Sequence, residues 1–136
     1  MLLISFICYG TVASISLVFG IIYLTRPQFM PYHSLALGKP WSEVEPNIQI
    51  LILALMRVAG AGFIATAIAV TILLCFPFKA GEQWAIYGIF LICACTSFGS
   101  SYATFLVQNQ TPGNPPLKLS LGTILLTVVG FLCSIL

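Results

Sequence analysis

The sequence predicts an all-α membrane protein, in which four transmembrane helices pack together as one bundle. Of its 136 residues, 60% are hydrophobic and only 6% are charged, whereas about 25% of residues are charged in a soluble domain. Four apolar segments stand out, at residues 2–24, 48–75, 84–107 and 119–136. All eight prolines lie outside these segments, where the missing backbone N–H does not interrupt a helix. We therefore expect a single transmembrane domain over residues 1–136.

The lengths of the four segments fit this prediction. As helices they would measure roughly 34, 42, 36 and 27 Å at 1.5 Å per residue. The hydrocarbon core of a bilayer is about 30 Å thick, so each segment can cross it. The first segment has no basic residue before it and is longer than the apolar core of a signal peptide, so we expect it to be a retained span.

Residues 25–47 connect the first two spans and are too apolar for a free loop. Pro31 can open a short helix, and Gly38 can end it. Trp41 follows Pro40 and can begin a second helical turn at the level of the lipid headgroups. We therefore expect this segment to lie on the membrane face as an interfacial loop.

The second span, residues 48–75, is longer than a crossing requires and is rich in alanine and glycine on several faces. Small residues allow membrane helices to approach one another closely. We expect this span to be the most surrounded helix of the bundle. It also carries Arg57, the one charged residue within the four spans.

The other three spans each show small or polar residues at steps of three and four, which places them on one helical face. Packed membrane helices place such faces against each other. In the first span this stripe is Tyr9, Ala13, Ser16, Gly20 and Tyr23; in the third it is Cys93, Ser97, Ser100, Ser101, Thr104 and Gln108; in the fourth it is Ser120, Thr123, Thr127, Gly130 and Ser134.

Four spans place both termini at one end of the bundle, together with residues 76–83; we call this the termini end. The opposite end contains residues 25–47 and 108–118, and we call it the loop end. Three basic residues lie at the loop end and one at the termini end. Basic residues favour the cytoplasmic side. We therefore expect a multi-pass protein of the bacterial inner membrane with both termini on the non-cytoplasmic side.

Arg57 belongs to the loop-end half of the second span, where most of the buried polarity gathers. In one interpretation it forms an ion pair with Glu43 or Glu45 and ties the interfacial loop to the bundle. In another it lines a site for an anionic or polar headgroup. In a third it extends to the membrane surface without a partner. The candidate ligand-binding residues are Arg57, His33, Glu43, Glu45, Ser100, Ser101 and Tyr102.

Several known chemistries lack their residues in this chain. No C-x-x-C pair is present, and none of the four spans contains the carboxylate that a proton-coupled exporter requires. His33 is the only histidine and has no thiol near it, so no metal site is expected. The five cysteines are scattered through apolar segments and predict free, buried thiols. No catalytic residue and no cofactor other than bound lipid is expected.

The interfacial segment RPQFMPYHSLALGKPWSEVEPN, with LMRVAGAGF after it, resembles small uncharacterised four-span membrane proteins from bacteria. The resemblance covers residues 26–116. It implies four spans and contains no motif that is tied to a chemistry, so it assigns no functional residue.

The leading functional hypothesis is a non-catalytic accessory subunit of a larger integral membrane complex. Its partners would be membrane lipids and other membrane protein subunits; the net charge of +2 does not suggest nucleic acid. The alternative is a small lipid-, quinone- or metabolite-binding protein with a polar site around Arg57. An enzyme that acts on a lipid-soluble substrate comes third. A cavity next to Arg57 would favour the binding protein. A helix face too rich in small residues for lipid, with no cavity, would favour the subunit.

Overall fold

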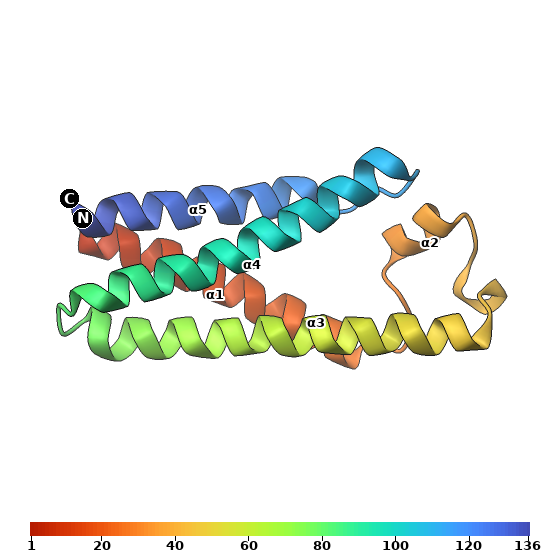
Figure 1. Ribbon diagram of the computed structural model, residues 1–136, viewed down its shortest axis with the longest axis horizontal. Helices are drawn as coiled ribbons and strands as arrows, with labels where there is room; N and C mark the ends of the chain where they lie inside the picture. Colours follow the sequence, from red (N-terminus) through yellow and green to blue (C-terminus); the bar gives the residue numbers. More distant parts are fainter.

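The computed structural model describes all 136 residues and confirms an all-α membrane bundle. Four helices are long and apolar enough to span a bilayer. They run up, down, up and down along one axis, and the two termini lie side by side at one end (Figure 1). The chain is therefore an integral multi-pass membrane protein. The elements are α1 (Leu2–Thr25), α2 (Pro31–Leu37), η1 (Trp41–Glu43), α3 (Pro46–Leu73), η2 (Leu74–Phe78), α4 (Gln83–Gln110) and α5 (Leu117–Ile135).

The second long helix, α3, is the longest, because the π-helical turn η2 continues it without a break. Together they form a span of 33 residues, Pro46–Phe78, which is about 50 Å long. Pro46 occupies the first turn, where a proline costs no hydrogen bond. Gly81, with a φ of 80°, turns the chain into α4. At the loop end α3 extends beyond the end of α1 (Figure 1).

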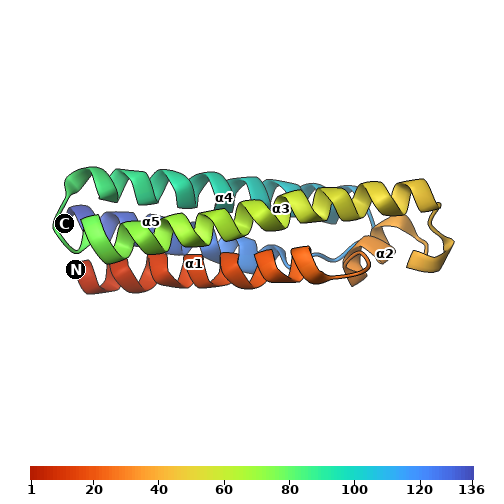
Figure 2. The ribbon, with the colours of Figure 1, turned by 90° about the horizontal axis from the view of Figure 1, so that it is seen from below.

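The interfacial segment folds as its prolines and glycine predict. Pro31 begins α2, Gly38 ends it with a left-handed φ of 65°, and Trp41 begins η1. Phe29, just before α2, is buried in a small cluster with Val44 and Met56. Both views place α2 at the loop end of the bundle, near the start of α3 (Figure 2).

Helix α1 crosses the bundle from one neighbour to another. Near its start, the Ser5 hydroxyl donates a hydrogen bond of 2.7 Å to the carbonyl of Gly130 in α5. Near its end it meets α3 backbone to backbone: a Cβ built on Gly60 would lie 2.9 Å from the Gly20 carbonyl oxygen. The α1/α3 pair therefore diverges from the α4/α5 pair toward the loop end (Figure 1).

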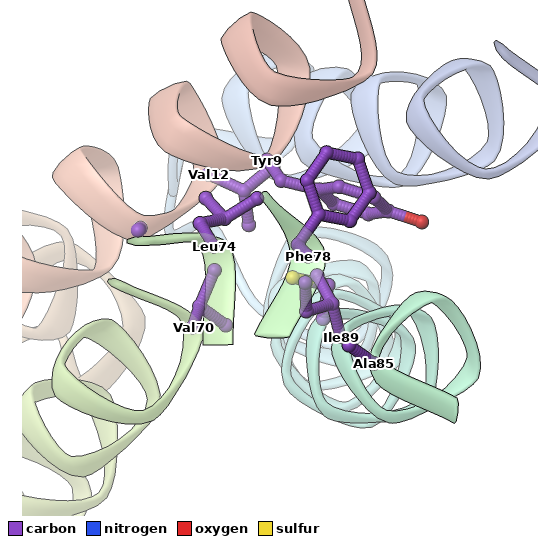
Figure 3. Close-up of a cluster of buried hydrophobic side chains, with 9 residues drawn as sticks. Tyr9, Val12, Val70, Leu74, Phe78, Ala85 and Ile89 are labelled. Atoms are coloured by element: carbon purple, nitrogen blue, oxygen red, sulfur yellow. The ribbon is translucent and has the colours of Figure 1, made fainter. Parts of the chain in front are cut away.

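The main hydrophobic core lies in the termini half, where the helices converge. Tyr9 and Val12 of α1 pack there with Val70, Leu74 and the first turns of α4 (Figure 3). The ring of Tyr9 lies within this cluster and its hydroxyl points away from it. The complete buried cluster is Tyr9, Val12, Ala13, Val70, Leu74, Phe78, Ala85, Ile89 and Cys93.

The three predicted polar stripes do lie on the inner faces of their helices. In α1, Tyr9, Ala13, Ser16 and Gly20 are buried. The stripes of α4 and α5 are likewise buried over much of their length, at Cys93, Ser97, Ser101, Thr123, Thr127 and Gly130. The i, i+3 and i+4 spacing therefore located the inward faces correctly.

The expectation that the second span is the most surrounded helix is wrong. In the most apolar stretch of α1, 33% of residues are buried, against 22% in α3. Gly60 is buried against α1, whereas Ala54, Ala61, Gly62 and Ala65 are exposed. The small residues of α3 lie on several faces, and only one of those faces has a close neighbour. Composition alone does not show which face that is.

The cysteines are all free, as predicted, but they are not all buried. Cys8 and Cys93 lie in the interior, and Cys133 is partly buried. Cys75 and Cys95 are exposed on the outside of the bundle. In an apolar span an exposed thiol meets lipid rather than water, so the apolar sequence around it does not indicate burial.

Candidate functional site

A cavity of about 270 Å³ lies between the diverging helices in the loop-end half of the bundle. All four long helices contribute to its wall, and α2 contributes Tyr32 and His33. The cavity exists because α1 and α3 separate from α4 and α5 in this half, and side chains do not fill the space. Its lining residues are Val12, Ile15, Ser16, Phe19, Tyr23, Tyr32, His33, Ala59, Phe63, Thr96, Ser97, Ser100, Ala103, Thr104, Val107, Pro115, Pro116, Leu119, Ser120 and Thr123.

The wall contains no lysine, arginine, aspartate or glutamate; its polar groups are hydroxyls and one imidazole. Most of the hydroxyls donate their hydrogen to a carbonyl of their own helix. Ser100 donates to Thr96 (2.7 Å), Thr104 to Ser100 (2.6 Å) and Thr123 to Ser120 (2.7 Å). A hydroxyl that donates in this way retains its oxygen lone pairs as acceptors.

Ser16 differs from the other hydroxyls of the wall. It is 5% exposed, and its hydroxyl makes no hydrogen bond within the protein, although it lines the cavity. Ser97, in contrast, lies 3.5 Å from the Thr127 hydroxyl, whose own hydrogen goes to the Thr123 carbonyl at 2.7 Å. Ser16 therefore has both a donor and an acceptor free for a molecule in the cavity.

Two tyrosines meet where α2 closes the loop end of the cavity. The hydroxyls of Tyr23 in α1 and Tyr32 in α2 are 2.6 Å apart and share one hydrogen bond. Burial, and then the bond to Tyr23, raise the pKa of Tyr32 above its ordinary value, so this phenol stays protonated. One phenol proton lies in the shared bond, and the other is free to bind an acceptor.

His33 has a defined proton position. The backbone N–H of Met30 donates to its Nδ1 at 3.3 Å, which caps the start of α2. A neutral imidazole whose Nδ1 accepts carries its proton on Nε2. Burial lowers the pKa of His33 below its ordinary value, which keeps the ring neutral at pH 7. Its Nε2–H makes no hydrogen bond within the protein and is a free donor.

Arg57 does not belong to this site. It is exposed, and its guanidinium donates one long hydrogen bond of 3.4 Å to the carbonyl of Leu53 in its own helix. Glu45 is the N-cap of α3, twelve residues before Arg57, which is about 18 Å along the axis. That separation exceeds the length of the two side chains, so the expected ion pair with Glu45 does not form. Glu43 is exposed in η1, and no ion pair joins it to the arginine.

The remaining predicted site residues divide into two groups. His33 and Ser100 line the same cavity. Ser101 is buried but lies outside the lining, and its hydroxyl has no partner. Tyr102 is 66% exposed on the outer face of α4. Glu43 and Glu45 are exposed outside the cavity, so of the seven candidates only His33 and Ser100 come together.

Sequence reasoning missed most of the polar wall as a site. Ser16, Tyr23, Ser97 and Thr104 were assigned to helix-packing stripes, and Tyr32 was not singled out. The signal was present, since the stripes of the first and third spans both place hydroxyls in the loop-end half. The spacing does not show whether such a stripe meets a neighbouring helix or an open space.

The chain was also compared with known proteins. No protein-family model matches it, and no curated protein or solved structure matches it. The geometry and chemistry of the cavity therefore carry the functional proposal.

Proposed function

We propose that this chain binds a lipid-soluble small molecule in the cavity between its four helices. The observation that carries the proposal is the cavity itself, in which 10 of the 20 lining residues are hydrophobic and the polar groups of the wall are nine hydroxyls and one imidazole. Ligand sites are typically apolar concavities with a small number of polar groups that fix orientation. A volume of about 270 Å³ accommodates a headgroup or ring rather than a whole lipid.

We infer that the molecule enters from the lipid, between α3 and α4. Ala59 on α3 and Ala103 on α4 both line the cavity and are both exposed on the outside of the bundle. The one hydrogen bond between these two helices joins Thr66 to Thr96 at 3.0 Å. The two helices diverge toward the loop end (Figure 1). A side chain of alanine size leaves this edge open to acyl chains.

The experiment compares Ala59→Trp, which places an indole at the opening, with Ala61→Trp on the same helix. Ala61 is also exposed but does not line the cavity. A hydrophobic diazirine probe is photolysed with each purified variant, and labelled peptides are counted by mass spectrometry. We expect Ala59→Trp to abolish labelling of the cavity wall and Ala61→Trp to leave it as in the wild type. Equal labelling in the two variants would refute the proposal.

A second candidate is the accessory subunit, and the outer face of α3 supports it. Three alanines, Ala54, Ala61 and Ala65, form an exposed stripe with Val58 beside Arg57. A charged residue that faces lipid near the middle of a span costs about 2.5–3.5 kcal/mol. An acidic residue of a partner helix that packs on this stripe would remove that cost.

Native mass spectrometry after gentle solubilisation tests this second candidate. A partner polypeptide that is lost in Arg57→Leu, but retained in the exposed control variant Tyr102→Leu, would support it. A single species with the mass of one chain, recovered from native membranes, would exclude it and leave the binding protein.

We also propose that the loop end faces the cytoplasm of a bacterial inner membrane. Arg26, Lys39 and Lys118 lie at that end, and Lys79 lies at the other. The excess of basic residues at the loop end supports this orientation. It would place the opening of the cavity in the cytoplasmic half of the bilayer.

A further inference from the structure

Hydrogen-bond acceptors and hydrogen-bond donors lie in different parts of the cavity wall. Along α4 and α5, the hydroxyls of Ser100, Thr104 and Thr123 donate to their own helices and present only acceptors. At the α2 end two protons are free to donate: the Nε2–H of His33 and one phenol proton of the Tyr23–Tyr32 pair. This separation of acceptors from donors limits the chemical class of the ligand that the proposed function requires.

A ligand that fills the α2 end must carry an acceptor atom to satisfy the free donors there. A carbonyl oxygen has two lone pairs and can accept from an imidazole N–H and from a phenol together. A ligand hydroxyl could accept as well, but its own hydrogen would then need an acceptor. His33 Nδ1 is already occupied by the Met30 N–H, and the remaining acceptors there are the phenol oxygens of Tyr23 and Tyr32, which accept weakly because their lone pairs are delocalised into the ring. The α2 end therefore fits a carbonyl better than a hydroxyl.

The absence of charge from the wall excludes ionic ligands. No lysine, arginine, aspartate or glutamate is among the lining residues, and burial keeps His33 neutral. A carboxylate, phosphate or ammonium group in this cavity would lose its hydration without an opposite charge in return. Such a group is far more costly to bury than a neutral carbonyl.

Aromatic rings cover the wall formed by α1 and α3. The ring centroids of Tyr23 and Phe63 are 6.1 Å apart with the planes at 80°, and those of Phe19 and Tyr23 are 6.5 Å apart. All three residues line the cavity. Ring faces and edges of this kind favour contact with another flat ring over contact with a flexible acyl chain.

We propose that the cavity binds a neutral ring that carries a carbonyl group, of the quinone type, with its hydrophobic tail directed between α3 and α4. The carbonyl oxygen accepts from His33 Nε2–H and from the tyrosine pair, and the ring packs on Phe19 and Phe63. Ser16, whose hydroxyl has no partner in the protein, lies two turns before Tyr23 on the same face of α1 and binds the far edge of the ring. This inference rests on the proposed function and concerns binding alone.

Four probes with similar decyl tails separate the ligand classes. They are a decyl benzoquinone, the dimethyl ether of its quinol, decanoylglycerol and decanoate. Binding to the purified chain in detergent is measured by the shift in the midpoint of thermal unfolding as each probe is added. We expect the quinone to bind at least tenfold more tightly than the ether, which has no carbonyl, and than decanoate. Tighter binding of decanoate than of the quinone, or equal binding of the ether and the quinone, would overturn the inference. Tighter binding of decanoylglycerol than of the quinone would indicate an acyl ester as the ligand and would overturn the inference too.

Variants of His33 show whether its donor is used. Glutamate and glutamine can both accept from the Met30 N–H and so preserve the cap of α2. His33→Glu removes the donor, whereas His33→Gln supplies an amide N–H₂. We expect affinity for the quinone to fall at least tenfold in His33→Glu and by less than threefold in His33→Gln, with similar unfolding midpoints without ligand. Equal affinities in the two variants would contradict a hydrogen bond from residue 33.

The failure of this inference can be told apart from failure of the proposed function. If none of the four probes binds but Ala59→Trp still abolishes photolabelling of the wall, the ligand class is wrong and the cavity remains a binding site. If no probe binds and Ala59→Trp changes nothing, both proposals fall.

Discussion

The contact between α1 and α3 makes Gly60 a residue whose enlargement should disturb the bundle sharply. A Cβ added there would lie 2.9 Å from the Gly20 carbonyl oxygen and 3.0 Å from the Leu24 backbone nitrogen. Both atoms belong to the backbone of α1, so neither can move aside as a flexible side chain does. Gly60→Ala must therefore push the two helices apart or strain one of them.

The magnitude follows from two opposing effects. Forcing one extra carbon into a packed contact costs about 1–3 kcal/mol. Replacing glycine by alanine inside a helix gains up to about 1 kcal/mol of helix propensity in water. Gly62→Ala measures that second effect alone, because a Cβ at Gly62 would have no atom within 4 Å. We expect Gly60→Ala to be about 1–3 kcal/mol less stable than Gly62→Ala.

The assay is reversible unfolding in mixed micelles as the fraction of SDS rises, followed by circular dichroism. Lipid provides no hydrophobic drive for helix association, so close packing at such contacts supplies much of the stability that this assay measures. If Gly60→Ala is as stable as Gly62→Ala, or more stable, α1 and α3 do not meet backbone to backbone at this position.

Three further predictions concern the loop end and the orientation. The neutral Nδ1 of His33 caps α2, and burial lowers the pKa of this imidazole, so the contribution of the cap to stability is complete above about pH 6.5, the unfolded pKa, and is lost as the pH falls through the lower folded pKa. The protection factors of the α2 amides, which correct for the pH dependence of intrinsic exchange, should therefore fall at acid pH, and protection factors that do not change with pH would contradict the cap. Gly113→Ala would place a Cβ 2.9 Å from the Tyr32 carbonyl oxygen and should loosen α2, seen as faster exchange there with an unchanged global midpoint. Single cysteines at Lys39 and Lys79, in a background without native thiols, should be labelled from outside intact cells only at position 79, and labelling only at position 39 would reverse the orientation.

The fold could be predicted from the sequence because its determinants are local. Hydropathy over about twenty residues locates a span wherever its neighbours lie. Pro31 and Gly38 act through their own backbone preferences, so the ends of α2 followed from two residues. The inward faces followed from spacing, since buried small and polar residues recur along one side of a helix.

The position of Arg57 could not be predicted in the same way. Sequence distance from the start of the span gave its depth, but not the direction in which its side chain points. The direction depends on which face of α3 packs on α1, and Gly60 decides that. Glycine and alanine occur around the whole helix, so composition offered several faces for the contact with α1. It therefore did not show whether Arg57, three residues before Gly60, lies on the contact face or outside it. The sequence therefore predicts the correct half of the span for Arg57 but the wrong face of the helix.

The cavity depends on an angle between helices, which no residue specifies alone. Ser5 holds the start of α1 against α5 through Gly130, and Gly20 holds its end against α3. Two close contacts with different partners oblige α1 to cross the bundle, and the crossing separates the two helix pairs at the loop end. Had α1 run beside one partner for its whole length, the Ser16 hydroxyl would have met a neighbouring helix and the stripe would have been a packing surface, as predicted. The same small residues that bring helices together at two points therefore leave a space between them elsewhere, and the hydroxyls that face this space become available to a ligand.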